Sequence, residues 1–188
     1  MGKTGGGPGT NQYKIRGQSG LSRVVLPAFA PEDVSPERRR IMGKQLGLPP
    51  EFLIRMSYDS DSEVREAVAG NPETDSATFQ RLARDKVADV REAVAGNVAC
   101  PPDVLRFLSS DPASKVAWTV AKNPATPQDV LRALIYYGLG MRANVAANTA
   151  CPPDLLLRLL DDEDEMVVMS AKSNIEVLPP HLRTIAGI

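Results

Sequence analysis

The sequence predicts an all-α protein, a short α-solenoid built from two-helix repeats of about 25–26 residues. The first observation is a recurring motif: Val-Arg-Glu-Ala-Val-Ala-Gly-Asn occupies residues 64–71 and again 90–97. Its pattern then recurs with more changes at 116–123, 141–148 and 167–174. A fixed period of this size is typical of stacked supersecondary units rather than of one globular core. The second observation is that aromatic residues make up only 5% of the chain, so Ala, Val and Leu must build thin, closely packed layers.

Each repeat divides into two short helical segments. In the first, Val64, Ala67 and Val68 fall at positions i, i+3 and i+4 and share one face of a helix. Asn71 is expected to end this helix, because asparagine tolerates the left-handed conformation found at many helix ends. The second segment begins at prolines, as at 101–102 and 152–153, which are favoured in the first helical turn. Neither segment exceeds about ten residues, so stacking must supply the stability.

The chain divides into an arm, residues 1–34, and a solenoid of about five and a half repeats, residues 35–188. Residues 1–31 contain no acidic side chain and carry a charge of +4, and the first twenty hold seven of the fourteen glycines. Such a composition predicts an arm that is flexible or becomes ordered on a partner. Ser35, followed by proline and glutamate, predicts the start of the first solenoid helix, which should run to about residue 45.

Composition also bounds the function. The net charge of −1 creates no field that favours nucleic acid or membrane, and residues 32–188 carry about −5, the difference between −1 and the +4 of residues 1–31. No apolar run approaches about 18 residues, and the N-terminus lacks the apolar stretch of a signal peptide, so we expect a soluble cytoplasmic protein. Cys100 and Cys151 occupy equivalent positions two repeats apart, roughly 20 Å if layers are about 10 Å apart. That separation is too large for a disulfide, so both are expected to be reduced structural residues.

The repeat pattern resembles that of the leucine-rich repeat variant family. The family signature is close to Val-Arg-x-x-Val-Ala-x-Asn followed by a proline-led Leu-Leu-x-x-Leu segment, and residues 64–188 carry it throughout, with a weaker match at 35–63. The resemblance implies a right-handed superhelix of α-helices alternating with 3₁₀ or short α-helices. The repeats here are slightly longer than usual for the family, so the second segment could be a full α-helix, as in armadillo or HEAT-like stacking. One family member carries an iron–sulfur cluster on N-terminal cysteines. This chain has no cysteine before Cys100, so that property is not carried over.

The sequence gives no support for catalysis, a cofactor or a metal site. His181 is the sole histidine and has no nucleophile or metal ligand beside it in sequence. The asparagines that recur in every repeat are predicted to be structural, since function rarely needs five copies: Asn71, Asn97, Asn123, Asn148 and Asn174. The acidic run 161–165 is either a solvated loop that favours the following helix N-terminus or a contact for a basic partner.

The two helix positions after the first valine of each repeat are predicted to face outward. They change from Arg and Glu in the early repeats to apolar residues later, and they include Trp118, the only tryptophan. Trp118 either packs against residues 136–140 or a neighbouring helix, or is a hot spot for a partner. The predicted partner-binding surface is Arg65, Arg91, Trp118, Tyr136, Tyr137, Arg142 and Met169.

The leading functional hypothesis is a non-enzymatic protein-interaction module, a scaffold or adaptor that binds a macromolecular partner along its stacked helices. The alternative is nucleic-acid or ribonucleoprotein binding through the arm, where basic groups and a tyrosine could follow a phosphate backbone and stack on a base. The residues predicted for that contact are Lys3, Tyr13, Lys14, Arg16 and Arg23. The sequence leaves the oligomeric state open.

Overall fold

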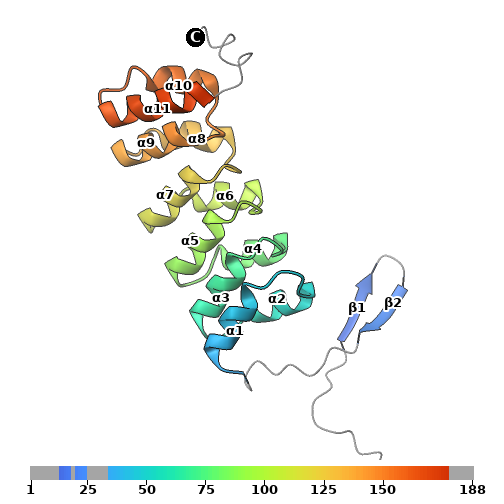
Figure 1. Cartoon of the computed structure of the whole chain (residues 1–188). Helices are drawn as coiled ribbons and strands as arrows, with labels where there is room; N and C mark the ends of the chain where they lie inside the picture. Colours follow the sequence, from blue (N-terminus) through green and yellow to red (C-terminus); the bar gives the residue numbers. More distant parts are fainter. Residues whose placement is uncertain (1–12, 18–19, 25–33, 178–188) are drawn as a thin grey trace, which may run out of the picture.

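The structure, a computed structural model, describes residues 13–17, 20–24 and 34–177 (Figure 1). Within 34–177 two kinds of helix alternate, as the sequence predicts. The first helices of the repeats are α1 (Pro36–Gly43), α3 (Ser62–Ala69), α5 (Ala88–Gly96), α7 (Ser114–Lys122), α9 (Leu139–Ala147) and α11 (Glu165–Val177). The second helices are α2 (Pro50–Met56), α4 (Ser76–Leu82), α6 (Pro102–Leu108), α8 (Gln128–Leu134) and α10 (Pro153–Leu159).

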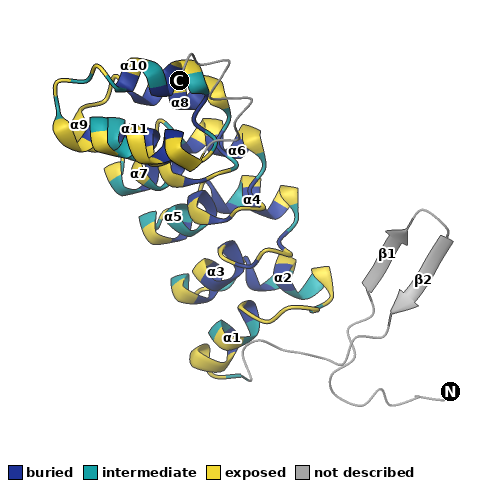
Figure 2. Ribbon diagram, turned by 45° about the horizontal axis from the view of Figure 1, so that its top comes forward, coloured by how far each residue is buried: buried dark blue, intermediate teal, exposed yellow. Residues whose placement is uncertain are grey.

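The first helices form a continuous row, in which each packs directly on the next from α1 to α11. The second helices form a parallel row and pack mainly against first helices rather than on each other (Figure 1). Buried residues lie between the two rows and exposed residues lie outside them (Figure 2). This arrangement confirms a solenoid of helical repeats, and the second segments are α-helices of seven residues.

The core is built from the periodic apolar positions. The valines that open the first-helix motif and the leucines of the second helices are almost completely buried, as are the alanines between stacked first helices: Val64, Val90, Val116, Leu105, Leu131, Leu156, Ala69, Ala95, Ala121 and Ala146. Small residues at the alanine position let neighbouring helices approach closely. Lys172 takes that position in α11 and is exposed, as expected where the pattern changes at the last repeat.

The recurring asparagines join one repeat to the next. The Nδ2 group of Asn97 donates to the carbonyls of Ala69 and Asn71, both at 2.9 Å, and its Oδ1 accepts from the N–H of Ala99 at 2.9 Å. The same two donations to the preceding layer recur at residues 71, 123, 148 and 174. The predicted structural role is therefore confirmed. The predicted left-handed conformation is wrong, because Asn97 ends its helix with an extended backbone (φ −76, ψ 122).

Two local features differ from the sequence prediction. β1 (Tyr13–Gly17) and β2 (Gly20–Val24) form an antiparallel hairpin inside the arm, where apolar and basic residues alternate between glycines, the pattern of a short hairpin. Helix α11 has 13 residues, longer than the predicted limit of about ten. It continues past Asn174 because isoleucine, glutamate and valine follow, with no proline or glycine to end it.

Candidate functional site: the surface around Trp118

Buried ion pairs fix one edge of the solenoid. Arg65 donates from Nε and Nη2 to the two carboxylate oxygens of Asp85, at 2.6 and 3.0 Å, and the two side chains are only 8% and 7% exposed. We call such a pair, an arginine of the first helix with the aspartate twenty residues later, a clasp. Further clasps join Arg39 to Asp59, Arg91 to Asp111 and Arg142 to Asp162. The prediction that Arg65 faces solvent is therefore wrong, because this side chain turns inward and holds its own repeat closed.

Each clasp also connects to the next repeat. Besides its carboxylate bonds with Arg65, Asp85 accepts from the N–H of Val87 at the start of α5 through Oδ1, and its carbonyl accepts from Nη1 of Arg91 at 2.7 Å. The hydrogen bond to Asp85 raises the pKa of Arg65. Burial alone would raise the pKa of Asp85, but the hydrogen bonds and charge of Arg65 outweigh it and hold this pKa below its usual range. The clasp thus favours the charged form of both partners.

The fourth repeat has no clasp. Ala117 stands at the arginine position and Tyr137 at the aspartate position, so both charges are absent together. Ala117 is buried, whereas Tyr137 is exposed. The following residue, Gly138, has φ +94 and begins α9 without a side-chain cap, and this repeat is one residue shorter than its neighbours. The repeat that departs most from the pattern is therefore the one that carries Trp118.

Trp118 lies on α7 beside the start of α9. A Cβ atom added to Gly140 would lie 3.8 Å from Cζ2 of the indole, yet Trp118 remains 49% exposed. The contact agrees with the predicted packing against residues 136–140. The exposed half leaves a large aromatic surface for a partner, so the two readings of Trp118 are compatible.

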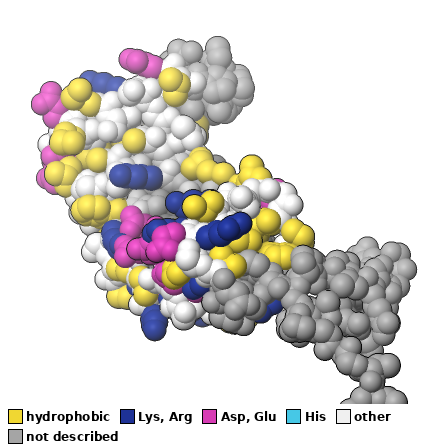
Figure 3. Space-filling view, turned by 60° about the horizontal axis from the view of Figure 1, so that its bottom comes forward, with side chains coloured by type: hydrophobic (Ala, Val, Ile, Leu, Met, Phe, Trp, Pro, Cys, Tyr) yellow, Lys and Arg dark blue, Asp and Glu magenta, His cyan; other side chains and the backbone are white. Residues whose placement is uncertain are grey.

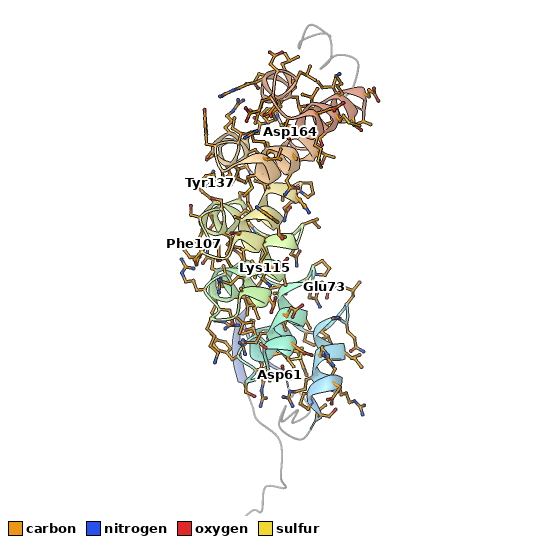
Figure 4. The ribbon with its side chains drawn as sticks, turned by 90° about the vertical axis from the view of Figure 1, so that its left-hand side faces the viewer. Asp61, Glu73, Phe107, Lys115, Tyr137 and Asp164 are labelled. Atoms are coloured by element: carbon orange, nitrogen blue, oxygen red, sulfur yellow. The ribbon has the colours of Figure 1, made fainter. Side chains whose placement is uncertain are left out.

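The exposed side of the first helices changes character at Trp118. Towards α1 it is charged: Arg40 pairs with Glu63, and Lys115 pairs with Asp89 and Glu92. Figure 3 shows acidic and basic side chains gathered together on the body, and Figure 4 labels Lys115 midway along the stack. Towards α11 most described residues of this surface are uncharged: Ala143, Ala147, Met166, Met169, Ser170 and Ser173. The exposed charges there include Lys122, one turn after Trp118, and Glu176, near the end of α11.

A hollow of about 400 Å³ lies at this end, lined by residues of α9, the following turn and α11 that include Ala147, Met169 and Val177. Met166 and Met169 are 66% and 62% exposed. Methionine is flexible and polarisable, so it adapts to differently shaped apolar partners. We define the Trp118 surface as Trp118, Ala143, Ala147, Met166 and Met169.

The structure separates the predicted surface residues into different places. Trp118 and Met169 lie on first helices. Tyr136 and Tyr137 lie between α8 and α9, where Figure 4 shows Tyr137 along the same edge as Phe107 of α6. Arg142 is held by Asp162 and Glu163 in the last clasp. Sequence periodicity missed this separation, because it did not reveal that the first position after the valine points to the clasp and only the second points outward.

Groups that could carry chemistry are few among the described residues. Cys100 and Cys151 are free and buried, and burial raises the pKa of each thiol to about 12, so neither is a thiolate near neutral pH. In the described part of the chain, no three His, Cys, Asp or Glu side chains come together as a metal site would require. None of the helices there is both long and apolar enough to cross a membrane. His181 and Lys3 lie outside the described residues, as do the side chains of Tyr13, Lys14, Arg16 and Arg23.

Comparison with known proteins agrees with this architecture. Residues 116–167 match the family model of the leucine-rich repeat variant domain. A solved structure described as a leucine-rich repeat variant with a novel repetitive protein structural motif is similar, with 26% sequence identity and a TM-score of 0.56. The match covers 85% of this chain and 69% of that chain. No curated protein matches the sequence. The helical repeats, their recurring asparagines and these two matches show a solenoid of helical repeats that is similar to the leucine-rich repeat variant fold.

Proposed function

We propose that this protein is a non-enzymatic interaction module, a scaffold or adaptor that binds an apolar segment of a partner protein on the Trp118 surface. The observation that carries the proposal is the exposure of Trp118, Met166 and Met169 on the outer side of α7 and α11. Exposed apolar side chains that gather in one place are typical of interaction sites, and Trp and Met are enriched at interfaces.

The other recurring side chains of the repeats make contacts inside the solenoid, which supports placing the binding site on the Trp118 surface. The Asn amides bond to neighbouring backbone carbonyls, the clasp arginines are paired with aspartates, and the thiols are buried. Trp118 and the two methionines are not needed for any of these contacts. A partner that covers them would remove apolar area from water, at roughly 25 cal/mol per Å².

The test begins with capture of partners from nuclease-treated host lysate by the tagged full-length chain. A captured protein is then purified and its binding measured directly. Trp118→Ala and Met169→Ser should each weaken that binding at least tenfold, the size typical of a hot spot, while leaving the melting temperature nearly unchanged. Phe107→Leu, at the other edge of the stack, is the matched control. Equal loss in the control, or a collapse in stability of Trp118→Ala, would contradict the proposal.

The second candidate is nucleic-acid or ribonucleoprotein binding through the arm. It is favoured by the absence of any acidic residue from 1–31 and by the basic residues within the hairpin sequence. Deleting residues 2–23 should then remove an affinity that falls steeply with salt. Unchanged nucleic-acid binding after the deletion would exclude this role for the arm.

A further inference from the structure

A second surface follows the C-terminal ends of the second helices. Three times, a guanidinium lies over an aromatic ring of the adjacent repeat: Arg81 over Tyr58 at 4.0 Å, Arg84 over Phe107 at 4.5 Å and Arg158 over Tyr136 at 5.5 Å. In each pair, one residue stands at the repeat position of Arg81 and the other at the repeat position of Tyr58. In the second pair the two residue types are exchanged, with Phe107 at the position of Arg81 and Arg84 at the position of Tyr58. We call these six residues the arginine–aromatic stripe.

The rings of the stripe remain open to a ligand. Tyr58 and Tyr136 are about 70% exposed and Phe107 about half, although each already contacts an arginine. Four of the five exposed aromatic side chains among the described residues lie at this edge, the fourth being Tyr137. Core packing does not account for rings placed outside the core, one repeat after another.

The arginines of the stripe lack carboxylate partners. Among the described residues, ion pairs engage Arg39, Arg40, Arg65, Arg91, Arg106, Arg132 and Arg142. None is formed by Arg81, Arg84 or Arg158, or by Arg55, which occupies the position of Arg81 one repeat earlier. Arg81 and Arg84 donate instead to the backbone carbonyls of Ser57 and Gln80.

Along α2 and α4, Asp85 acts electrostatically on Arg81 but is already hydrogen-bonded to Arg65. At the other end, Arg158 shares a hollow with Asp161 and Glu163, which reduce the local positive potential. Arg55, Arg81 and Arg84 therefore form the part of the stripe best suited to an anion, with the rings of Tyr58 and Phe107 between and beside them.

We propose that the arginine–aromatic stripe binds single-stranded nucleic acid. Guanidinium groups along the edge would contact successive phosphates, while the open rings and the guanidinium planes would stack on bases. An acidic peptide would use the charges but would leave the row of rings unexplained. This site is distinct from the Trp118 surface and does not involve the arm. Because residues 32–188, without the basic part of the arm, carry about −5, the binding is expected to be modest and strongly salt-dependent.

The test measures fluorescence anisotropy of labelled oligothymidylate and oligouridylate, each about 15 nucleotides long, with the full-length protein at several salt concentrations. Arg55→Gln with Arg84→Gln should weaken binding and flatten the dependence of log K on log salt by about 1.4, or 0.7 per phosphate contact on single strands. Tyr58→Leu with Phe107→Leu keeps apolar bulk but removes the rings. It should weaken binding at least tenfold at unchanged salt slope, since stacking on each ring contributes separately from charge.

The matched control is Arg106→Gln with Arg132→Gln. It removes the same charge from the second helices, one repeat position before that of Arg81 and Phe107, at arginines paired with Asp129 and Asp154. This control should bind as the wild type does, and far-UV melting should show that all variants are folded. Comparing oligothymidylate with oligouridylate shows whether the stripe binds single-stranded DNA or single-stranded RNA.

Three results would overturn the proposal: no binding of either probe at low salt, equal losses in the stripe and control variants, or equally tight binding of a polyglutamate peptide. The last result would assign the stripe to an acidic protein segment. None of these measurements depends on the Trp118 surface, so its failure as a protein-binding site would be seen separately.

Discussion

The clasp between Arg65 and Asp85 allows a quantitative test of what holds the repeats together. Arg65→Ala would remove both guanidinium bonds from the carboxylate of Asp85, a side chain that is 7% exposed in the intact pair. The carbonyls of Asp59 and Ser60 would lose the Nη1 donor as well. Breaking one partner of a buried pair typically costs about 3–5 kcal/mol, and we expect about 3 kcal/mol here.

The double variant Arg65→Ala with Asp85→Tyr reproduces the natural composition of the fourth repeat. It should be less destabilising than Arg65→Ala alone, because no buried charge remains unpaired. Urea denaturation followed by far-UV circular dichroism would give both free energies and their coupling. A loss below about 1 kcal/mol for Arg65→Ala, or a double variant as unstable as the sum of the single variants, would refute the reasoning.

The same pair predicts a pH dependence. The pKa of Asp85 is lowered in the folded protein. Its contribution is therefore fully present above the unfolded value of about 3.9 and is lost as the pH falls through the lower folded value. Denaturation series should show stability falling as the pH is lowered below about 4, with a smaller change in Arg65→Ala. An equally steep fall in that variant would contradict the assignment.

Three further outcomes are expected. Asn97→Ala removes two buried hydrogen bonds and a third that is partly buried, and should lower the free energy of unfolding by about 3 kcal/mol, at roughly 1 kcal/mol per bond; chemical denaturation measures this. Cys100 and Cys151, with thiol pKa values of about 12, should react with a thiol reagent at pH 8 only as fast as the protein opens, and rapid labelling of the native state would count against their burial. Ala117→Arg with Tyr137→Asp should restore the missing clasp and raise the melting temperature by about 2–4 °C if the pair contributes about 1 kcal/mol; an unchanged or lower melting temperature would show that the fourth repeat cannot accommodate it.

Periodicity predicted the architecture because it records burial directly. Residues such as Val64 and Val90 recur at one spacing since every layer must bury the same positions. Periodicity gave a wrong prediction where a polar side chain contacts a residue that is distant in the sequence. The motif carries an arginine in repeat after repeat, but its partner aspartate lies twenty residues away, in a segment that the motif does not include. Arg65 was therefore expected on the surface.

The two candidate sites differ in the same way, because one could be found from the sequence and the other could not. Trp118 could be singled out from the sequence because it is the only tryptophan and replaces charged residues at its position. The arginine–aromatic stripe could not, because Arg84 and Phe107 come from different repeats and exchange positions relative to Tyr58 and Arg81. Only the stacking of the layers brings each guanidinium over its ring.

The fourth repeat explains how a structural repeat can gain a specific surface. Its neighbours use the arginine and aspartate positions to close each layer, and losing one partner alone would leave a buried charge. Ala117 and Tyr137 replace both together, which avoids that penalty. The Asn123–Asn148 link still joins α7 to α9 at the other edge, so the stack is preserved. Ala117 directly precedes the exposed Trp118 on α7, and we therefore propose partner recognition at the repeat that has lost the internal contact.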